Sequence, residues 1–171
     1  MDDGPPRVAL VFDGTDGRGR AVAEEVADRA ARRGGPGTDL LDLAEAGLPE
    51  AVRGHPGPVP CAVADLGPWL ADADAFVVVA VGDGPPAGLR DAVGWCADTW
   101  RDKPIALVVL GTPADALRVG SLLRSLPTGP VVATASLRTD PGTDRSRQDA
   151  ADRLLDHLLR WTHPLRRTRT Q

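Results

Sequence analysis

Residues 7–26 have the sequence RVALVFDGTDGRGRAVAEEV, in which an apolar run, a glycine-rich loop and an amphipathic segment follow one another directly. The run 7–12 predicts a buried strand, and Val22 and Val26 share one face of a predicted helix over 18–33. In such an arrangement the loop's N–H groups and the positive end of the helix dipole point at one spot, where a phosphate can bind. The stretch therefore predicts both the start of an α/β sheet and a candidate site at its edge.

The rest of the chain alternates short apolar runs with helical patterns. We expect further strands at 38–43, 75–81, 104–110 and 130–135, and helices at about 65–72, 87–100, 115–126 and 148–161. The proline-rich stretch 47–60 is expected to be a long loop. Strands that alternate with helices predict a parallel sheet with helices on both faces. We therefore predict an α/β, flavodoxin-like, doubly wound five-stranded parallel sheet of order 2-1-3-4-5 in a three-layer α/β/α arrangement.

The predicted domain organisation is a single domain over residues 1–162, followed by a basic tail over residues 163–171 that we expect to be frayed and solvated. The 171 residues carry a formal net charge of -4, which argues against nucleic acid or an acidic membrane as a partner. No run approaches the roughly 18–20 apolar residues of a membrane span, and no early stretch resembles a signal peptide. Two cysteines are too few for a disulfide scaffold. We therefore expect a cytoplasmic protein.

The first candidate site is the loop that follows the first strand. Its candidate residues are Gly14, Thr15, Asp16, Gly17, Arg18, Gly19 and Arg20. Backbone amides and the Thr15 hydroxyl would bind a phosphate, with Arg18 or Arg20 as the cation. The opposing interpretation is a strand-to-helix turn that needs glycine and is capped by Asp16. Two carboxylates, Asp13 and Asp16, would repel a phosphate unless they point away from it.

Two further loops follow later strands at the same predicted edge of the sheet. Their candidate residues are Gly82, Asp83, Gly84 and Pro85 after the third predicted strand, and Gly111 and Thr112 after the fourth. The carboxyl ends of neighbouring parallel strands form the crevice in which doubly wound proteins bind ligands. Plain turns, with a solvated aspartate in one and a helix cap in the other, are the opposing interpretation.

Other residue patterns that could carry chemistry are incomplete in this sequence. Asp13, Asp83 and Thr112 resemble the acidic pocket of a response-regulator receiver, but Asp83 lies beyond its strand and no lysine follows the fifth predicted strand. The histidines have no metal-like spacing, and neither a Ser-His-Asp order nor paired catalytic carboxylates stand out. We therefore expect no metal site and no catalytic side chain.

Three segments resemble a known enzyme family. They are ADAFVVV at 73–79, PAGLRDAVGW at 86–95 and DKPIA at 102–106. They are similar to the Ala-Asp-Ala strand, the Pro-Gly-Ala-Leu-Lys-Asn-Ala-Ile-Asp-Trp helix and the Gly-Lys-Pro segment of the NADPH-dependent FMN reductase family. The similarity extends over roughly residues 7–161 and is greatest in the scaffold helix over 89–95.

The resemblance implies FMN held by the three loops, NADPH or NADH as co-substrate, a small-molecule acceptor and a homodimer. Main-chain N–H groups of residues 82–86 would contact the flavin ring. The family's first loop usually carries a Gly-Ser-x-Arg pattern, whereas Asp16 stands near the place of that arginine. The second loop is shorter and lacks the family's tyrosine. Two functions follow: an FMN-dependent NAD(P)H oxidoreductase, or a flavodoxin-like protein that has lost cofactor binding and serves as a non-catalytic binding or assembly partner.

Overall fold

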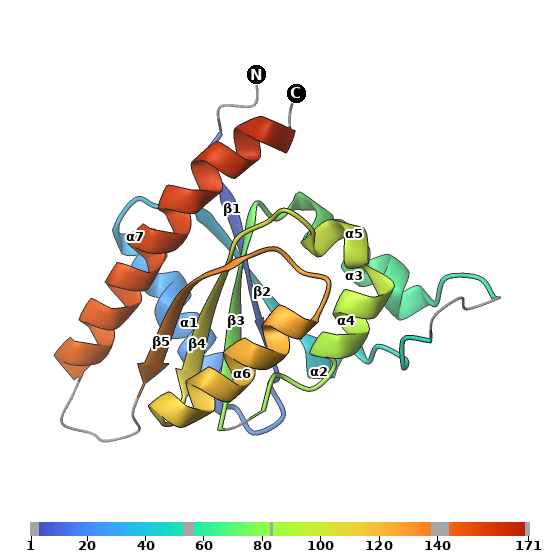
Figure 1. The fold of residues 1–171 in the computed structure, drawn as a ribbon, viewed down its shortest axis with the longest axis horizontal. Helices are drawn as coiled ribbons and strands as arrows, with labels where there is room; N and C mark the ends of the chain where they lie inside the picture. Colours follow the sequence, from blue (N-terminus) through green and yellow to red (C-terminus); the bar gives the residue numbers. More distant parts are fainter. Residues whose placement is uncertain (1–3, 53–56, 83, 138–143, 170–171) are drawn as a thin grey trace.

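Five parallel strands form the centre of the molecule in the computed structural model, which describes residues 4–52, 57–82, 84–137 and 144–169. The strands are β1 (Arg7–Phe12), β2 (Gly37–Asp42), β3 (Ala75–Val81), β4 (Ile105–Leu110) and β5 (Val131–Leu137). They pair in the order β2-β1-β3-β4-β5, and every pairing is parallel. The predicted flavodoxin-like sheet is confirmed, with its switch point between β1 and β3 (Figure 1).

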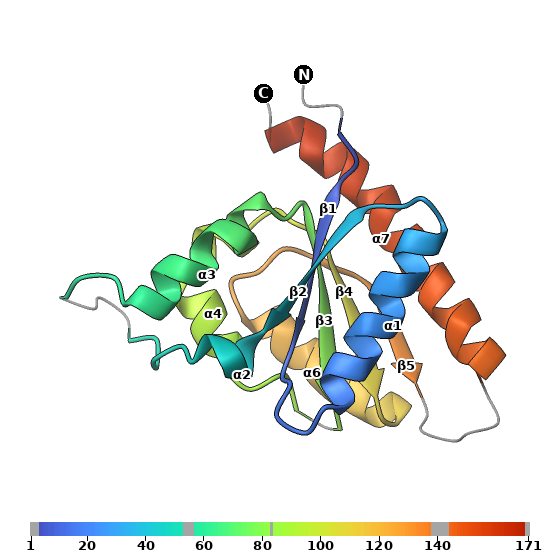
Figure 2. The ribbon, with the colours of Figure 1, turned by 180° about the vertical axis from the view of Figure 1, so that it is seen from behind.

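Helices cover both faces of this sheet (Figures 1 and 2). One face carries α1 (Arg18–Arg32) and α7 (Asp144–Arg169). The other carries α3 (Cys61–Asp72), α4 (Leu89–Trp95), α5 (Ala97–Trp100) and α6 (Pro113–Ser125). A short helix, α2 (Leu43–Ala46), follows β2 directly. Among the described residues, no helix is long and apolar enough to cross a membrane.

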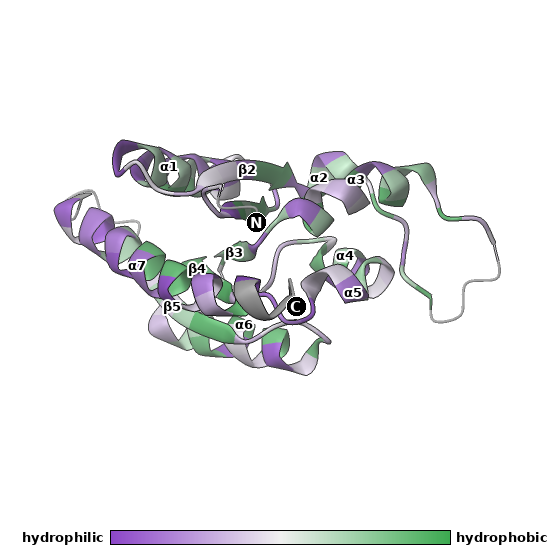
Figure 3. Ribbon diagram, turned by 90° about the horizontal axis from the view of Figure 1, so that it is seen from above, coloured by the Kyte–Doolittle hydropathy of each residue, from purple (hydrophilic) through white to green (hydrophobic). Residues whose placement is uncertain are grey.

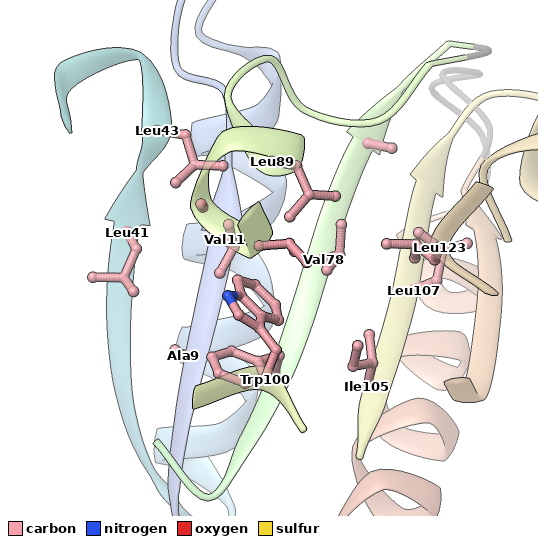
Figure 4. Packing of buried hydrophobic residues seen from close by; sticks show 14 of the residues in the cluster. Ala9, Val11, Leu41, Leu43, Val78, Leu89, Trp100, Ile105, Leu107 and Leu123 are labelled. Carbon is pink, nitrogen blue, oxygen red and sulfur yellow. The ribbon is translucent and has the colours of Figure 1, made fainter. Parts of the chain in front are cut away.

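The core lies on both sides of β3 and β4, whose continuous apolar sequences are typical of central parallel strands. Figure 3 shows these hydrophobic strands between the two helical layers. On the face of α3–α6, Trp100 is fully buried near Val11, Val78 and Leu89 (Figure 4). Its ring stacks on Phe76 with the centroids 4.0 Å apart. Full burial of a large apolar side chain stabilises the fold by roughly 1.5–3 kcal/mol, so the loops at the sheet edge project from a well-packed frame.

The helix boundaries differ from the prediction in several places. The expected helix over 87–100 is divided into α4 and α5, because Cys96 has φ −118° and ψ 35° and interrupts the helical hydrogen bonding. Helix α3 begins at Cys61 rather than near residue 65. Helix α2 was not predicted, because a four-residue helix is too short to show hydrophobic periodicity.

The carboxyl-terminal arginines belong to α7, which continues past the predicted end at residue 161. An Arg166 guanidinium nitrogen donates to the carbonyl oxygen of Gly4 at 2.8 Å, and Arg166 Nε lies 3.5 Å from Asp74 Oδ1. The expectation of a frayed tail is therefore wrong for Arg166, since ion pairing and a backbone hydrogen bond hold it. The predicted boundary at residue 162 falls within α7. The start of β1 and the end of α7 lie at the sheet edge opposite the candidate loops (Figure 1).

Candidate functional site

A cavity of about 290 Å³ lies at the switch point, between the loop from β1 to α1 and the loop from β3 to α4. Its lining residues are Asp13, Thr15, Asp16, Arg18, Val79, Val81, Pro85 and Pro86. One wall is apolar and the other carries two carboxylates, a hydroxyl and a guanidinium. The structure thus brings together Thr15, Asp16, Arg18 and Pro85 from the predicted set. The volume is at the lower end of small-molecule sites, which span about 300–1,000 Å³.

Three larger depressions lie elsewhere among the described residues. One of about 640 Å³ runs beside β2 and α3, one of about 970 Å³ lies at the opposite sheet edge near Arg7 and Lys103, and one of about 460 Å³ lies beside β5 and α7. None of them lies at the switch point, where doubly wound proteins bind their ligands. The cavity between the β1 and β3 loops is therefore the candidate site despite its smaller volume.

The loop from β1 to α1 is held by its own carboxylate groups. The amide of Thr15 donates to Asp13 Oδ1 at 2.9 Å, and the Thr15 hydroxyl donates to the same oxygen. These hydrogen bonds lower the pKa of Asp13 from its ordinary value of 3.8, and the amide of Ala87 contributes further. Asp13 therefore stays ionised at neutral pH and holds the loop from β1 to α1 through Thr15.

Asp16 occupies the N-terminus of α1. Its Oδ1 accepts from the amide of Arg18 at 3.0 Å, and its Oδ2 accepts from Arg18 Nε at 2.7 Å. A terminal guanidinium nitrogen of Arg18 lies 2.6 Å from the same Oδ2. The Arg18 side chain and amide together lower the pKa of Asp16 from 3.8, with a smaller contribution from the Gly19 amide. The N-terminus of a helix, where the dipole is positive, is a common binding position for anions. In this chain the Asp16 carboxylate lies at that position.

The loop from β3 to α4 offers few amides to a ligand. The N–H of Gly82 donates to the carbonyl oxygen of Leu110 at 3.0 Å, and Gly82 has φ +75°. Pro85 and Pro86 have no amide hydrogen. Asp83, also predicted to bind the cofactor, lies outside the described residues. Gly84 is described but is not among the residues that line the cavity.

The loop from β4 to α6 uses its predicted residues to begin the helix. The N–H of Gly111 donates to the carbonyl oxygen of Leu137 at 2.9 Å. The amide and hydroxyl of Thr112 donate to Asp115 Oδ2 at 2.8 and 2.7 Å, and the Asp115 amide donates back at 3.2 Å. Hydrogen bonds from Thr112 lower the pKa of Asp115 from 3.8. Gly111 and Thr112 do not line the cavity, and their contact with a ligand stays a prediction.

The geometry and the sequence lead to one family, whose model, described as NADPH-dependent FMN reductase, matches residues 7–135. The chain belongs to the NADPH-dependent FMN reductase family. Its resemblance to that family, carried by residues 73–79, 86–95 and 102–106, is thereby confirmed. A comparison with curated proteins gives no match.

Solved structures with the same fold include proteins from several organisms. An oxidoreductase from Corynebacterium diphtheriae has a TM-score of 0.69 and 16% identity, over 94% of this chain and 98% of that one. A flavoenzyme NAD(P)H:(acceptor) oxidoreductase from Paracoccus denitrificans has a TM-score of 0.64 and 18% identity, over 91% and 98%. An NAD(P)H:quinone oxidoreductase from Methanothermobacter marburgensis has a TM-score of 0.60 and 14% identity, over 90% and 97%. At these identities the likeness shows the shared fold.

Both candidate arginines at the start of α1 are ion-paired with carboxylates of the chain. Arg20, one candidate for the phosphate's cation, lies 2.8 Å from Asp42 Oδ2 and 2.7 Å from Glu45 Oε1, with its guanidinium 5.4 Å from the Phe12 ring centroid. Arg18, the other candidate, is paired with Asp16. The amide of Gly14 donates to Asp42 Oδ1 at 3.0 Å. Asp42 was not among the predicted residues, although its register beside Phe12 at the end of β2 places it at this edge.

Gly19, in the first turn of α1, has no room for a side chain that could reach a phosphate. A Cβ at position 19 would lie 2.5 Å from the carbonyl oxygen of Asp13, so no hydroxyl side chain fits without a backbone shift. The described residues therefore do not fit the phosphate of FMN. They do fit a flat apolar ring, through Val79, Val81, Pro85 and Pro86. The two valines were expected only as strand residues, and their alternation at the end of β3 was the available signal for a cavity wall.

Proposed function

We infer that the protein is a flavin-dependent NAD(P)H oxidoreductase that passes electrons from NADPH or NADH, through a flavin, to a small-molecule acceptor. The observation that carries this proposal is the family match over residues 7–135, which includes both loops that border the cavity. The flavin supplies a two-electron carrier, so hydride transfer needs no acid or base from the chain. This agrees with a cavity whose charged groups are held in structural hydrogen bonds.

The chain's own residues have separate roles in this proposal. Val79, Val81 and the two prolines exclude water from one face of the ring. Thr15 and Arg18 lie on the polar side of the cavity. Among the described residues that line the cavity, none is aromatic. A homodimer is therefore part of the proposal, because a partner subunit could supply a stacking ring.

The test is reduction of flavin by NADPH and by NADH, followed anaerobically by absorbance, with quinones and free flavins as acceptors. Val81→Trp fills the cavity and is expected to lower flavin-dependent NAD(P)H oxidation at least about tenfold. Val59→Trp is the matched control, because Val59 is 62% exposed and does not line the cavity. Equal activities of the two variants would show that the reaction does not use this cavity.

A second candidate function, a non-catalytic binding partner without flavin, is favoured by one observation. The amides of Thr15 and Arg18 and both loop arginines already contact carboxylates of the chain. Under this alternative the wild-type protein neither retains nor reduces any flavin. The same absorbance experiment distinguishes the two functions before any variant is made.

A further inference from the structure

The polar wall of the cavity has an ordered arrangement in which a carboxylate takes the place of an external anion. At the start of α1, Asp16 accepts from the Arg18 amide and from the Arg18 guanidinium. A phosphate bound at a helix N-terminus uses the same kinds of donors: a first-turn amide and a neighbouring cation. These contacts involve both carboxylate oxygens of Asp16 and engage the amide and guanidinium of Arg18.

Asp13, the second carboxylate of the cavity wall, engages further donors that a phosphate would use. Asp13 takes the amide and hydroxyl of Thr15, the donors that a phosphate would need next. The cavity lining therefore carries two carboxylates and one guanidinium, a formal charge of minus one. A phosphate monoester carries between one and two negative charges near neutral pH, and like charges at contact distance repel each other in a partly enclosed site.

We propose that Asp16 substitutes for the ligand's phosphate, so that the site selects flavins that lack the 5′-phosphate and binds riboflavin in preference to FMN. This inference rests on the proposed function, because it assumes that a flavin ring enters the cavity. It goes beyond that function by naming the chemical class of flavin. The apolar wall of Val79, Val81, Pro85 and Pro86 is common to both ligands, and only the end of the ribityl chain distinguishes them.

The experiment compares the dissociation constants of riboflavin and FMN for the full chain, measured by quenching of flavin fluorescence. Wild type is expected to bind riboflavin at least about tenfold more tightly than FMN, and the preference is expected to shrink at high salt. Equal affinities, or tighter binding of FMN, would overturn the inference while leaving the proposed function intact. Binding of neither flavin would overturn the proposed function, and the inference with it.

Asp16→Asn tests the residue itself. The amide oxygen can still accept from the Arg18 N–H, but the negative charge is removed and the Arg18 guanidinium is released. FMN affinity is expected to rise about tenfold, whereas riboflavin affinity changes by less than about twofold. Asp28→Asn is the matched control, because Asp28 lies on the exposed face of α1 and its removal changes net charge equally. A rise in FMN affinity in both variants alike, or in neither, would contradict the role of Asp16.

Discussion

Helices α1 and α6 begin at the same edge of the sheet, but their first turns are built differently. Helix α6 has a capping box, in which Thr112 and Asp115 bond each other's backbone amides and the acid lies inside the first turn. Helix α1 has Gly17 in the left-handed conformation at its N-cap, no acidic residue in its first turn, and a carboxylate supplied from the preceding loop by Asp16. Helix α6 is thus capped from within its own first turn, whereas at α1 a carboxylate of the preceding loop accepts from the first-turn amide that an external anion would otherwise contact.

The largest expected difference between the two helices is their tolerance of a single methyl group. Gly19 on α1 would place a Cβ 2.5 Å from the Asp13 carbonyl oxygen, whereas at Gly120 on α6 the nearest atoms lie 3.5 and 3.7 Å away. Gly19→Ala should lower the free energy of unfolding by about 2 kcal/mol because the backbone must move. Gly120→Ala should be neutral or stabilising by up to ~1 kcal/mol through helix propensity.

Urea unfolding of both variants, followed by circular dichroism, measures this difference. Equal stabilities would mean that the start of α1 can relax away from Asp13. The close packing at Gly19 would then not explain why this position excludes a hydroxyl side chain.

The capping threonine of α6 and the loop threonine of α1 provide a smaller test. Thr112→Ala should destabilise the protein by about 1 kcal/mol, because the side chain accepts from the Asp115 amide at the N-cap. Thr15→Ala should lose less than about 0.5 kcal/mol, because its hydroxyl makes a solvent-exposed hydrogen bond outside any helix. Thermal unfolding gives both values. A Thr15 effect as large as that of Thr112 would show that the α1 loop is a structural cap as well.

The sequence was sufficient to predict the sheet, because β3 and β4 are short continuous apolar runs of the kind typical of central parallel strands and they alternate with helical patterns. It was also sufficient to place Thr15, Asp16, Arg18 and Pro85 around one cavity, since strand order fixes which loops meet. It could not predict the partners of Arg18 and Arg20. The sequence predicts Arg18 or Arg20 as the cation for a phosphate. In the structure, however, the Arg18 guanidinium contacts Asp16, and the Arg20 guanidinium contacts Asp42 and Glu45. Which of several nearby carboxylates an arginine contacts depends on side-chain rotamers and register, which hydrophobic periodicity does not determine.

The smallest expected effect concerns the charge of the two acids, Asp16 and Asp115. Their folded-state pKa values lie below 3.8, so each ionised group stabilises the fold above that pH, and this stabilisation is lost as the pH falls through the folded pKa. In Asp16→Asn and Asp115→Asn, the decline of the melting temperature between about pH 5 and pH 2 should therefore be shallower than in wild type.

High salt is expected to change the pH dependence of the melting temperature differently for Asp16→Asn and Asp115→Asn. Asp16 owes its lowered pKa first to the charged Arg18 side chain, and the two side chains are 44% and 61% exposed. Asp115 owes its lowered pKa first to the amide and hydroxyl of Thr112, which carry no net charge. In 1 M salt, where the screening length is about 3 Å, the difference between wild type and Asp16→Asn should shrink. The difference for Asp115→Asn should persist. If both differences shrank equally, the Asp16 turn would not be an ion-paired anion site, and the contrast between the two helix starts would reduce to two variants of ordinary capping.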